Sequence, residues 1–271
     1  MIEQEGHLGH KGETCFSRVP LCPLCLISEA NDDLSREVTK DIMICVVTDR
    51  RRLAGAGASF EGSRRCLIEQ ARFAADAGVD LIQVRERDLE AAELARLVTD
   101  LLEVTHDTLT RIIVNDRIDV ALACGAGGVH LRGDSVDVAD ARRLAPAGFL
   151  IGRSVHRVDE AVRAAQAADY LIAGTVFPTD SKPSATARLG LGGLQTIVRA
   201  VRAPVLAIGG VAENRIEDIR AAGAAGFAAI GCFMRPGGAA GAGSAVSCRA
   251  IPLRDLVERA RSRFDSVDTG P

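Results

Sequence analysis

The chain has 271 residues, of which 47% are hydrophobic and 25% charged, so it is long and apolar enough to bury a sizeable core. Its formal net charge is -3, only 3% of its residues are aromatic, and it has no tryptophan. This composition argues against a nucleic-acid partner, which would need a basic face and aromatic stacking platforms. No run approaches the roughly 20 apolar residues of a membrane span, and the N-terminus lacks the basic-then-apolar order of a signal peptide. We therefore expect a cytoplasmic protein with no membrane partner.

The first part of the chain differs from the rest. Residues 1–41 show no sustained hydrophobic periodicity, and the regular pattern begins abruptly at Met43 with the run MICVVTD. We predict a disordered extension over residues 1–41 and one domain over residues 42–265. A start of translation at Met43 is the alternative.

The eight cysteines are scattered along the chain, a distribution that favours reduced packing residues over disulfides. Cys22 and Cys25 form a CPLC motif that is typical of half a zinc site, but the second CxxC motif of such a site is absent. Reduced cysteines are therefore the favoured interpretation.

From residue 44 onward, short strand-like runs alternate with segments rich in Ala, Leu, Arg and Glu. The runs are ICVVT (44–48), LIQVR (81–85), RIIVN (111–115), GGVHL (127–131), FLIG (149–152), DYLIAG (169–174), PVLAIG (204–209) and GFAAIG (226–231). This alternation predicts parallel βαβ units, and eight of them predict a single closed (β/α)8 barrel; an open doubly wound sheet is the alternative. A Gly/Ala-rich insert at about 236–250 precedes the helix-like PLRDLVERARSRF, which we expect to close the barrel.

Such barrels carry their chemistry at the carboxyl ends of their strands. Polar residues and glycines recur at these ends: Thr48 and Asp49; Gln83, Arg85 and Arg87; Asn115 and Asp116; His130; Ser154 and His156; Thr175; Gly209 and Gly210; and Gly231. We expect them to meet at one mouth, where Arg85 and Arg87 would bind an anion. The alternative is that these two arginines are surface cations balanced by Glu86 and Asp88.

Two loops add to this expectation. The glycine pair Gly209–Gly210 follows the seventh run, where barrels of this class frequently bind phosphate, although a glycine pair also makes ordinary tight turns. The loop after the sixth run carries Thr179, Ser181 and Lys182, which suit a lid over a phosphorylated substrate or simply a polar loop.

A set of short motifs stands in a fixed order at the strand ends: VTDR (47–50), QVRER (83–87), VNDR (114–117), GVHL (128–131), IGRSVH (151–156), GTVFPTDSK (174–182) and AIGGV (207–211). Over roughly residues 43–235 the chain thereby resembles the family of thiamine-phosphate synthase and its relative, thiazole tautomerase. The resemblance implies a TIM barrel of thiamine biosynthesis. It also implies that the chain forms a homo-oligomer.

The resemblance further implies a reaction and its residues. The synthase condenses 4-amino-2-methyl-5-hydroxymethylpyrimidine diphosphate with a (carboxy)thiazole phosphate, giving thiamine phosphate and pyrophosphate. Positions that match the diphosphate site are Gln83, Arg85, Asn115 and Lys182, with Arg87 where the family usually has Lys. Ser154 matches a contact to the pyrimidine or the departing diphosphate. Positions that match the thiazole phosphate side are Thr179, Ser181, Gly209, Gly210 and Gly231. The implied catalytic residues are Arg85, Lys182, His156 and Ser154.

One departure from the family pattern concerns the metal. Asp116 matches a magnesium ligand, but where the family reads GQED after VHL this chain reads RGDS. Ser135 therefore stands at the second ligand position and Asp134 one residue earlier. We expect an Mg2+ site formed by Asp116 and Asp134 if the chain is a synthase.

Two other functions stay open at this point. One is a metal-independent tautomerase that uses no cofactor, with His156 as acid and base, since imidazole titrates near working pH. The other is a non-catalytic thiazole-phosphate binder, which would need neither Asp116 nor His156. The retained diphosphate positions favour the synthase.

Overall fold

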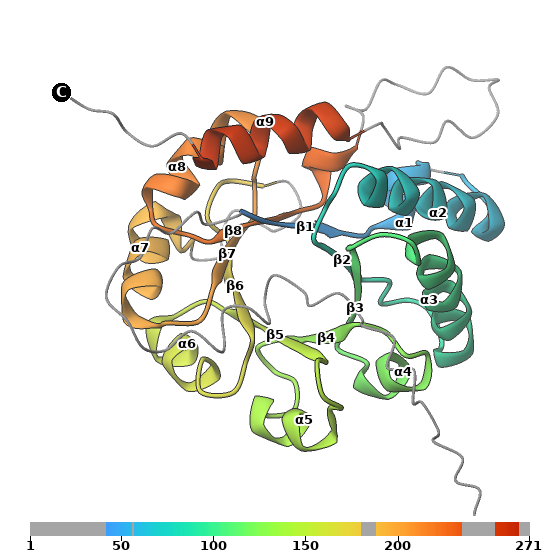
Figure 1. Cartoon of the computed structure of the whole chain (residues 1–271), viewed down its shortest axis with the longest axis horizontal. Coiled ribbons are helices and arrows are strands. Elements are labelled where there is room, and N and C mark those ends of the chain that lie inside the picture. Colours follow the sequence, from blue (N-terminus) through green and yellow to red (C-terminus); the bar gives the residue numbers. More distant parts are fainter. Residues whose placement is uncertain (1–41, 56, 180–187, 235–252, 266–271) are drawn as a thin grey trace, which may run out of the picture. The chain divides into compact units, whose positions relative to one another are not determined.

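The computed structural model describes residues 42–55, 57–179, 188–234 and 253–265. The predicted extension, the predicted insert, Cys22 and Cys25, and the candidate site residues Ser181 and Lys182 lie outside these residues. In the described part, eight parallel strands form a closed barrel in chain order, with β8 paired to β1, and helices surround it (Figure 1). The predicted (β/α)8 fold is confirmed, and each of the eight predicted runs overlaps a strand.

The elements follow one another as strand and helix around the barrel. The strands are β1 (Met43–Val47), β2 (Leu81–Val84), β3 (Arg111–Asn115), β4 (Gly128–Leu131), β5 (Leu150–Val155), β6 (Tyr170–Gly174), β7 (Val205–Ile208) and β8 (Gly226–Ala229). The helices are α1 (Arg50–Ala54), α2 (Phe60–Asp76), α3 (Ala91–Thr105), α4 (Ile118–Ala123), α5 (Val138–Leu144), α6 (Val158–Ala164), α7 (Gly190–Ala200), α8 (Ile216–Ala221) and α9 (Arg254–Asp265), with the short 3-10 helices η2 (Glu213–Arg215) and η3 (Gly231–Phe233).

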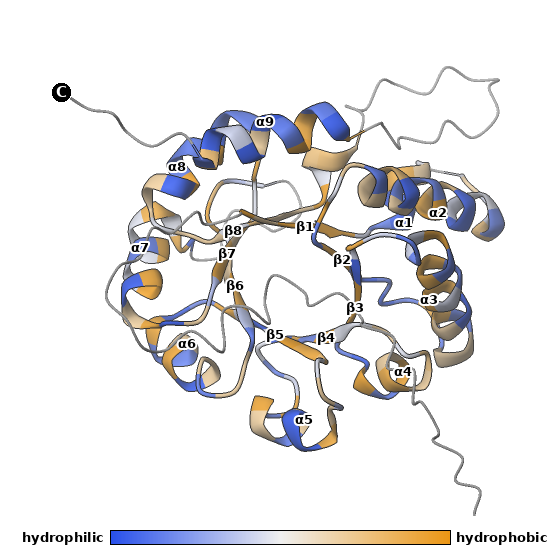
Figure 2. Cartoon of the chain, in the orientation of Figure 1, coloured by the Kyte–Doolittle hydropathy of each residue, from blue (hydrophilic) through white to orange (hydrophobic). Residues whose placement is uncertain are grey.

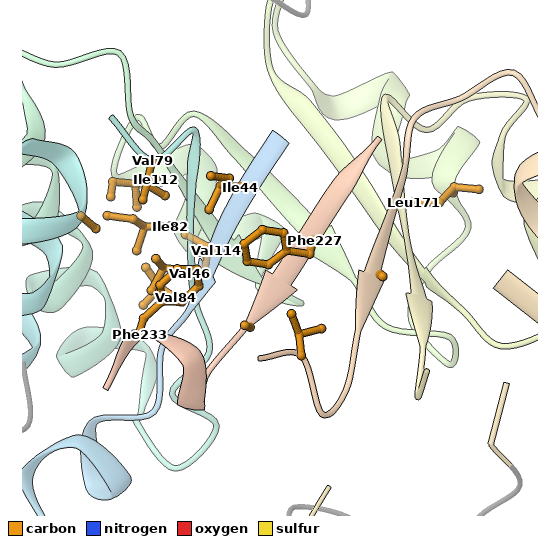
Figure 3. Close-up of a cluster of buried hydrophobic side chains, with 14 of the residues drawn as sticks. Ile44, Val46, Val79, Ile82, Val84, Ile112, Val114, Leu171, Phe227 and Phe233 are labelled. Carbon is orange, nitrogen blue, oxygen red and sulfur yellow. The ribbon is translucent and has the colours of Figure 1, made fainter. Parts of the chain in front are cut away.

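Alternate residues of each strand face opposite sides, one toward the helices and one toward the barrel interior. The helix-facing set forms a continuous apolar core that includes Ile44, Val46, Ile82, Val84, Ile112, Val114, Leu171 and Phe227 (Figure 3). The strands are mostly hydrophobic, while the helices carry hydrophilic residues on their outward sides (Figure 2). The period-two pattern therefore determines which strand residues pack against the helices and which point into the barrel. Of the inward residues, those at the carboxyl ends of the strands reach the mouth of the barrel, and the others fill its interior.

The cysteines of the described residues are free thiols, as predicted: Cys45, Cys66, Cys124 and Cys232. Burial raises the pKa of the Cys45 thiol to about 12, so this thiol stays protonated and serves as a small apolar side chain.

The last described helix, α9, packs on the barrel and contacts the segment just before β1. In α9, Leu256, Val257 and Ala260 are buried. Arg261 donates to the carbonyl oxygen of Ile42, at 3.0 Å, just before the first strand. No helix of the described residues is long and apolar enough to cross a membrane.

The seam between β8 and β1 depends on a glycine. A Cβ on Gly226 would overlap the carbonyl oxygen of Met43, its partner in the ladder. We expect Gly226→Ala to lower the free energy of unfolding by about 1–3 kcal/mol, because the strands must separate to admit the methyl group. The matched control is Gly192→Ala in α7, where nothing lies within 4 Å, and it should be neutral or stabilising by up to about 1 kcal/mol. Urea unfolding checks this, and equal midpoints for both variants would contradict it.

Candidate active site

A cavity of about 1030 Å³ opens at the carboxyl ends of the strands. The residues of the predicted site that line it are Gln83, Arg85, Arg87, Asn115, Asp134, Ser154, His156, Thr179, Gly209, Gly210 and Gly231. Inward-facing Val47, Ile172 and Ile208 also line it and provide apolar surface. Asp116 and Ser135 are not among the lining residues, although they lie directly beside them.

Two amides form part of the polar wall. Gln83 on β2 donates from Nε2 to Oδ1 of Asn115, the last residue of neighbouring β3, at 2.8 Å, and both residues are buried. The Oε1 atom of Gln83 is buried and accepts no hydrogen bond from the described residues. An unsatisfied buried acceptor costs about 1–3 kcal/mol, so this atom is suited to accept an N–H from a ligand.

Arg85 and Arg87 do not pair with the carboxylates that lie between and after them in the sequence. Glu86 and Asp88 instead bind Arg50, whose Nη1 donates to Glu86 Oε2 at 2.8 Å and to Asp88 Oδ1 at 2.7 Å. Within the described part of the chain, the guanidinium groups of Arg85 and Arg87 make no ion pair, and both line the cavity. The interpretation of these arginines as surface cations balanced by Glu86 and Asp88 is therefore wrong.

The Arg87 guanidinium lies in a cationic environment. Its pKa is lowered by partial loss of solvent and by the positive charges of Arg85 and Arg132, against the opposing pull of Asp116 and Asp134. A concentration of like charge at one wall of a cavity is suited to an anionic ligand that neutralises it.

A buried network behind this wall orients Arg85. The Thr48 hydroxyl donates to Glu86 Oε1 at 2.7 Å and accepts the backbone N–H of Arg85 at 2.9 Å. Burial raises the pKa of Glu86, while hydrogen bonds from Thr48 and Arg50 oppose that rise. The side chains of Arg50 and Glu86 are only 6% and 3% exposed, so the pair is shielded from water. It connects the ends of β1 and β2 beside Arg85 and Arg87, which line the cavity and are called the arginine wall below.

Ser154 is held by a buried histidine. Nε2 of His130 lies 2.8 Å from the Ser154 hydroxyl, and Nδ1 of His130 has no partner among the described residues. In the ladder His130 pairs with Gly152, and Gly152 with Tyr170. A Cβ on Gly152 would collide with both rings, whose centroids are 5.7 Å apart. Burial, and then the charge of Arg153, lower the pKa of His130 to about 3, so a neutral imidazole orients the serine.

This histidine predicts a pH dependence of stability. The unfolded chain protonates His130 below its ordinary pKa of about 6.5, whereas the folded chain does not until about pH 3. The free energy of unfolding therefore falls on acidification by about 1.4 kcal/mol per pH unit, or about 2 kcal/mol from this group by pH 5. We expect His130→Gln to lack this component in urea unfolding measured from pH 7.5 to 5, and His106→Gln, at an 80% exposed side chain, to keep it. Equal slopes for wild type and His130→Gln would contradict the assignment.

Near Arg87, the guanidinium of Arg132 spans two carboxylates. Nη1 of Arg132 lies 3.4 Å from Asp116 Oδ2, and Nη2 lies 2.5 Å from Asp134 Oδ2. The Ser135 hydroxyl donates to the other oxygen of Asp116. Asp116 has the left-handed backbone conformation, with φ of 64°, which is uncommon for a residue other than glycine and is frequent at functional sites.

A second wall of the cavity, after β7 and β8, is built from glycines and is called the glycine wall below. Gly209 and Gly210 have φ of 98° and 62°, and a Cβ on either would collide with the segment after β6, at Thr175 and at Pro178. No described residue accepts a hydrogen bond from their backbone N–H groups. These donors are therefore available to an anion. Nη2 of Arg52 lies 3.0 Å from the position of a Cβ on Gly231, at the same wall.

His156, the candidate acid and base, lies at the rim. Its ring Nδ1 is hydrogen bonded to the carbonyl oxygen of Gly174, so Nδ1 carries the proton and Nε2 is the free acceptor. Its backbone N–H donates to Glu160 Oε2 at 2.7 Å. The ring is thus fixed to β6 while its other nitrogen stays accessible.

Sequence reasoning missed Arg52 and Arg132 as cavity residues. Arg132 follows β4 directly, so the rule that selected Arg85 after β2 would have selected it too. Arg52 lies in α1, a helix of five residues whose periodicity is too short to detect.

The fold and this cavity define a (β/α)8-barrel enzyme with a mouth suited to anionic ligands. The family model "Thiamine monophosphate synthase" matches residues 46–233. Thiamine-phosphate synthase of Methanoculleus marisnigri is 41% identical over 202 residues, which cover 74% of this chain and 92% of that protein. The enzyme of Methanoregula boonei is 45% identical over 174 residues, covering 64% and 81%. The solved structure of thiamine phosphate pyrophosphorylase from Pyrococcus furiosus has a TM-score of 0.65 and 31% identity, covering 83% and 96%.

The chain therefore belongs to the thiamine monophosphate synthase family. Its activity is that of a thiamine-phosphate synthase, a transferase of thiamine biosynthesis, and the predicted family and function are confirmed. The tautomerase and binder alternatives find no support in these relatives.

Proposed function

We propose that the cavity joins a hydroxymethylpyrimidine diphosphate to a (carboxy)thiazole phosphate and releases pyrophosphate. The observation that carries the proposal is the pair of anion-binding walls on one cavity. Arg85 and Arg87 follow β2, and Gly209 and Gly210 follow β7, which β8 and β1 separate from β2 in the closed barrel. Two substrates that each carry phosphate require two such subsites.

The arginine wall is proposed to bind the diphosphate. In the reaction the bond between the pyrimidine methylene carbon and the diphosphate oxygen breaks, and its electrons leave with the oxygen. Arg85 and Arg87 stabilise this developing charge, and each charge-assisted hydrogen bond contributes about 1.5–3 kcal/mol. Arg87 presents a planar fork that can hold two phosphate oxygens at once. Lys182, outside the described residues, is proposed to add a further cation.

The remaining polar groups are proposed to position the organic rings. Oε1 of Gln83 accepts an N–H from the aminopyrimidine, and the Ser154 hydroxyl, oriented by His130, contacts the pyrimidine or the leaving diphosphate. The thiazole nitrogen then donates its lone pair to the methylene carbon and forms the new C–N bond. Apolar Val47 and Ile172 exclude water from this carbon. Without them, water would compete with the thiazole nitrogen and attack the carbon.

The glycine wall is proposed to bind the thiazole phosphate. The phosphate accepts hydrogen bonds from backbone N–H groups of Gly209, Gly210 and Gly231, and the hydroxyl of Thr179, which lines the cavity, is proposed to add another. Ser181, outside the described residues, is proposed to contact the same phosphate. Backbone donors fixed by the barrel need no reorganisation on binding, so they favour affinity.

Synthases of this family generally use Mg2+, which when bound neutralises charge on the leaving diphosphate. The predicted ligands of this ion are Asp116 and Asp134. Both carboxylates bind Arg132 instead, and Asp134 is 70% exposed. Among the described residues no group of three or more His, Cys, Asp or Glu is arranged to hold a metal ion. These residues therefore do not fit an open Mg2+ site, and no step above depends on one.

The test is an incubation of the purified protein with both substrates, with Mg2+ or with EDTA, followed by chromatography of thiamine phosphate and pyrophosphate. We expect thiamine phosphate and pyrophosphate to form in equal molar amounts. Aromatisation of the thiazole without coupling would instead support the tautomerase, with His156 as the residue to replace. Binding of thiazole phosphate with no product at all would support a non-catalytic binder.

A further inference from the structure

Arg132 is held in a defined place by its own loop. The backbone N–H of Arg132 donates to the Ser135 hydroxyl at 2.9 Å, and the backbone N–H of Ser135 donates to the carbonyl oxygen of Arg132 at 3.1 Å. The same hydroxyl donates to Asp116. This tight turn fixes the start of the Arg132 side chain, whose guanidinium then reaches both Asp116 and Asp134.

Arg132 also belongs to the arginine wall. It lines the same cavity as Arg85 and Arg87, and its positive charge is one of the influences that lower the pKa of Arg87. A guanidinium has five N–H donors. Asp116 accepts one N–H of Nη1, and Asp134 accepts one N–H of Nη2. Three donors therefore remain for an anion in the cavity.

We infer that Arg132 is a diphosphate-binding residue and a built-in cation of this site. It spans the two carboxylates that a divalent ion would require, so it occupies the place of that ion and presents its remaining N–H donors to the diphosphate. This inference rests on the function proposed above. Its consequence is that the site binds diphosphate with less need of Mg2+ than a site that presents open carboxylates, because the positive charge is covalently attached.

The experiment measures the binding of inorganic pyrophosphate by isothermal titration calorimetry, in EDTA and in Mg2+. We expect wild-type protein to bind in EDTA with a Kd within about threefold of that in Mg2+. Arg132→Gln should weaken binding in EDTA by about 10- to 100-fold, the range of one or two charge-assisted hydrogen bonds, and Mg2+ should restore part of the loss because both carboxylates are then free. Arg132→Lys, which keeps the charge but lacks the fork, should lie between them.

The matched control is Arg117→Gln. Arg117 forms the same kind of pair with Asp119, at 2.9 Å and 2.6 Å, adjacent to Asp116 in the sequence but outside the cavity. Its pyrophosphate affinity should equal that of wild type. Circular dichroism verifies that each variant is folded. If Arg132→Gln is not folded, the affinity of Arg132→Lys alone decides whether Arg132 binds pyrophosphate.

Two results would overturn the inference: wild-type protein that binds no pyrophosphate in EDTA, or an Arg132 variant that binds it as tightly as wild type. Formation of thiamine phosphate by wild-type protein, measured separately, shows whether the proposed reaction stands when the inference about Arg132 fails.

Discussion

Arg85→Gln is expected to lower kcat/KM for the pyrimidine diphosphate by about 100- to 1000-fold, the usual effect of removing one preorganised charge-stabilising donor. The Arg85 guanidinium lines the cavity, and within the described residues it makes no ion pair that would draw it elsewhere. Its backbone N–H donates to the Thr48 hydroxyl, so the backbone from which the guanidinium extends is held in place before substrate arrives. Charge that develops on the leaving diphosphate then remains without its nearest cation.

Steady-state kinetics of thiamine phosphate formation measures this effect. Arg85→Lys should recover part of the rate, because an ammonium group keeps the charge but not the planar fork. The free energy of unfolding of Arg85→Gln should stay within about 0.5 kcal/mol of wild type, since the side chain supports no structural contact. A fall in kcat/KM below tenfold in a folded variant would remove Arg85 from the proposed diphosphate site.

Arg50→Met is expected to lower the free energy of unfolding by about 3–5 kcal/mol. The substitution keeps an apolar side chain of similar length but leaves Glu86, whose side chain is 3% exposed, without its cationic partner. Breaking a buried pair on one side costs this much because the remaining charge has neither water nor a counterion. Activity should fall as well, because the Glu86 and Thr48 network orients Arg85.

The control for this prediction is Arg51→Met. Arg51 also pairs with Asp88, at 2.7 Å, but its side chain is 72% exposed, so its loss should cost at most about 1 kcal/mol.

The effect of Arg50→Met should also shrink on acidification. Burial already raises the pKa of Glu86, and without the Arg50 guanidinium that rise is opposed less, by the hydrogen bond from Thr48 and the backbone N–H of residue 50. A carboxyl group whose pKa is raised in the folded state lowers the free energy of unfolding as the pH rises above its unfolded pKa. The destabilisation by Arg50→Met is therefore largest at neutral pH. Equal losses for the two methionine variants would show that the Arg50 pair is not the support proposed here.

The sequence alone determined the fold class. Short apolar runs alternating with helical segments predict parallel βαβ units, and the strand positions followed from periodicity because each strand is buried on the face toward the helices. The same alternation predicted that Gln83 on β2 and Arg85 just after it point inward, and most of the polar and charged residues of the cavity could be named in advance. Gly209 and Gly210 were predicted from their position after the seventh run, and the structure adds that positive φ and close packing leave only glycine there.

Only the tertiary structure decided how the charges pair. The sequence places Glu86 and Asp88 beside Arg85 and Arg87, yet both carboxylates bind Arg50, which is distant in the chain and adjacent in space because β1 and β2 are neighbours. Likewise, Asp116 and Asp134 look like an open pair of metal ligands until β3 and β4 lie side by side and Arg132 spans them. Periodicity is a property of neighbouring residues and can be read along one strand. Ion pairing acts between side chains brought together by the closed barrel, so its outcome depends on distances that no local pattern contains.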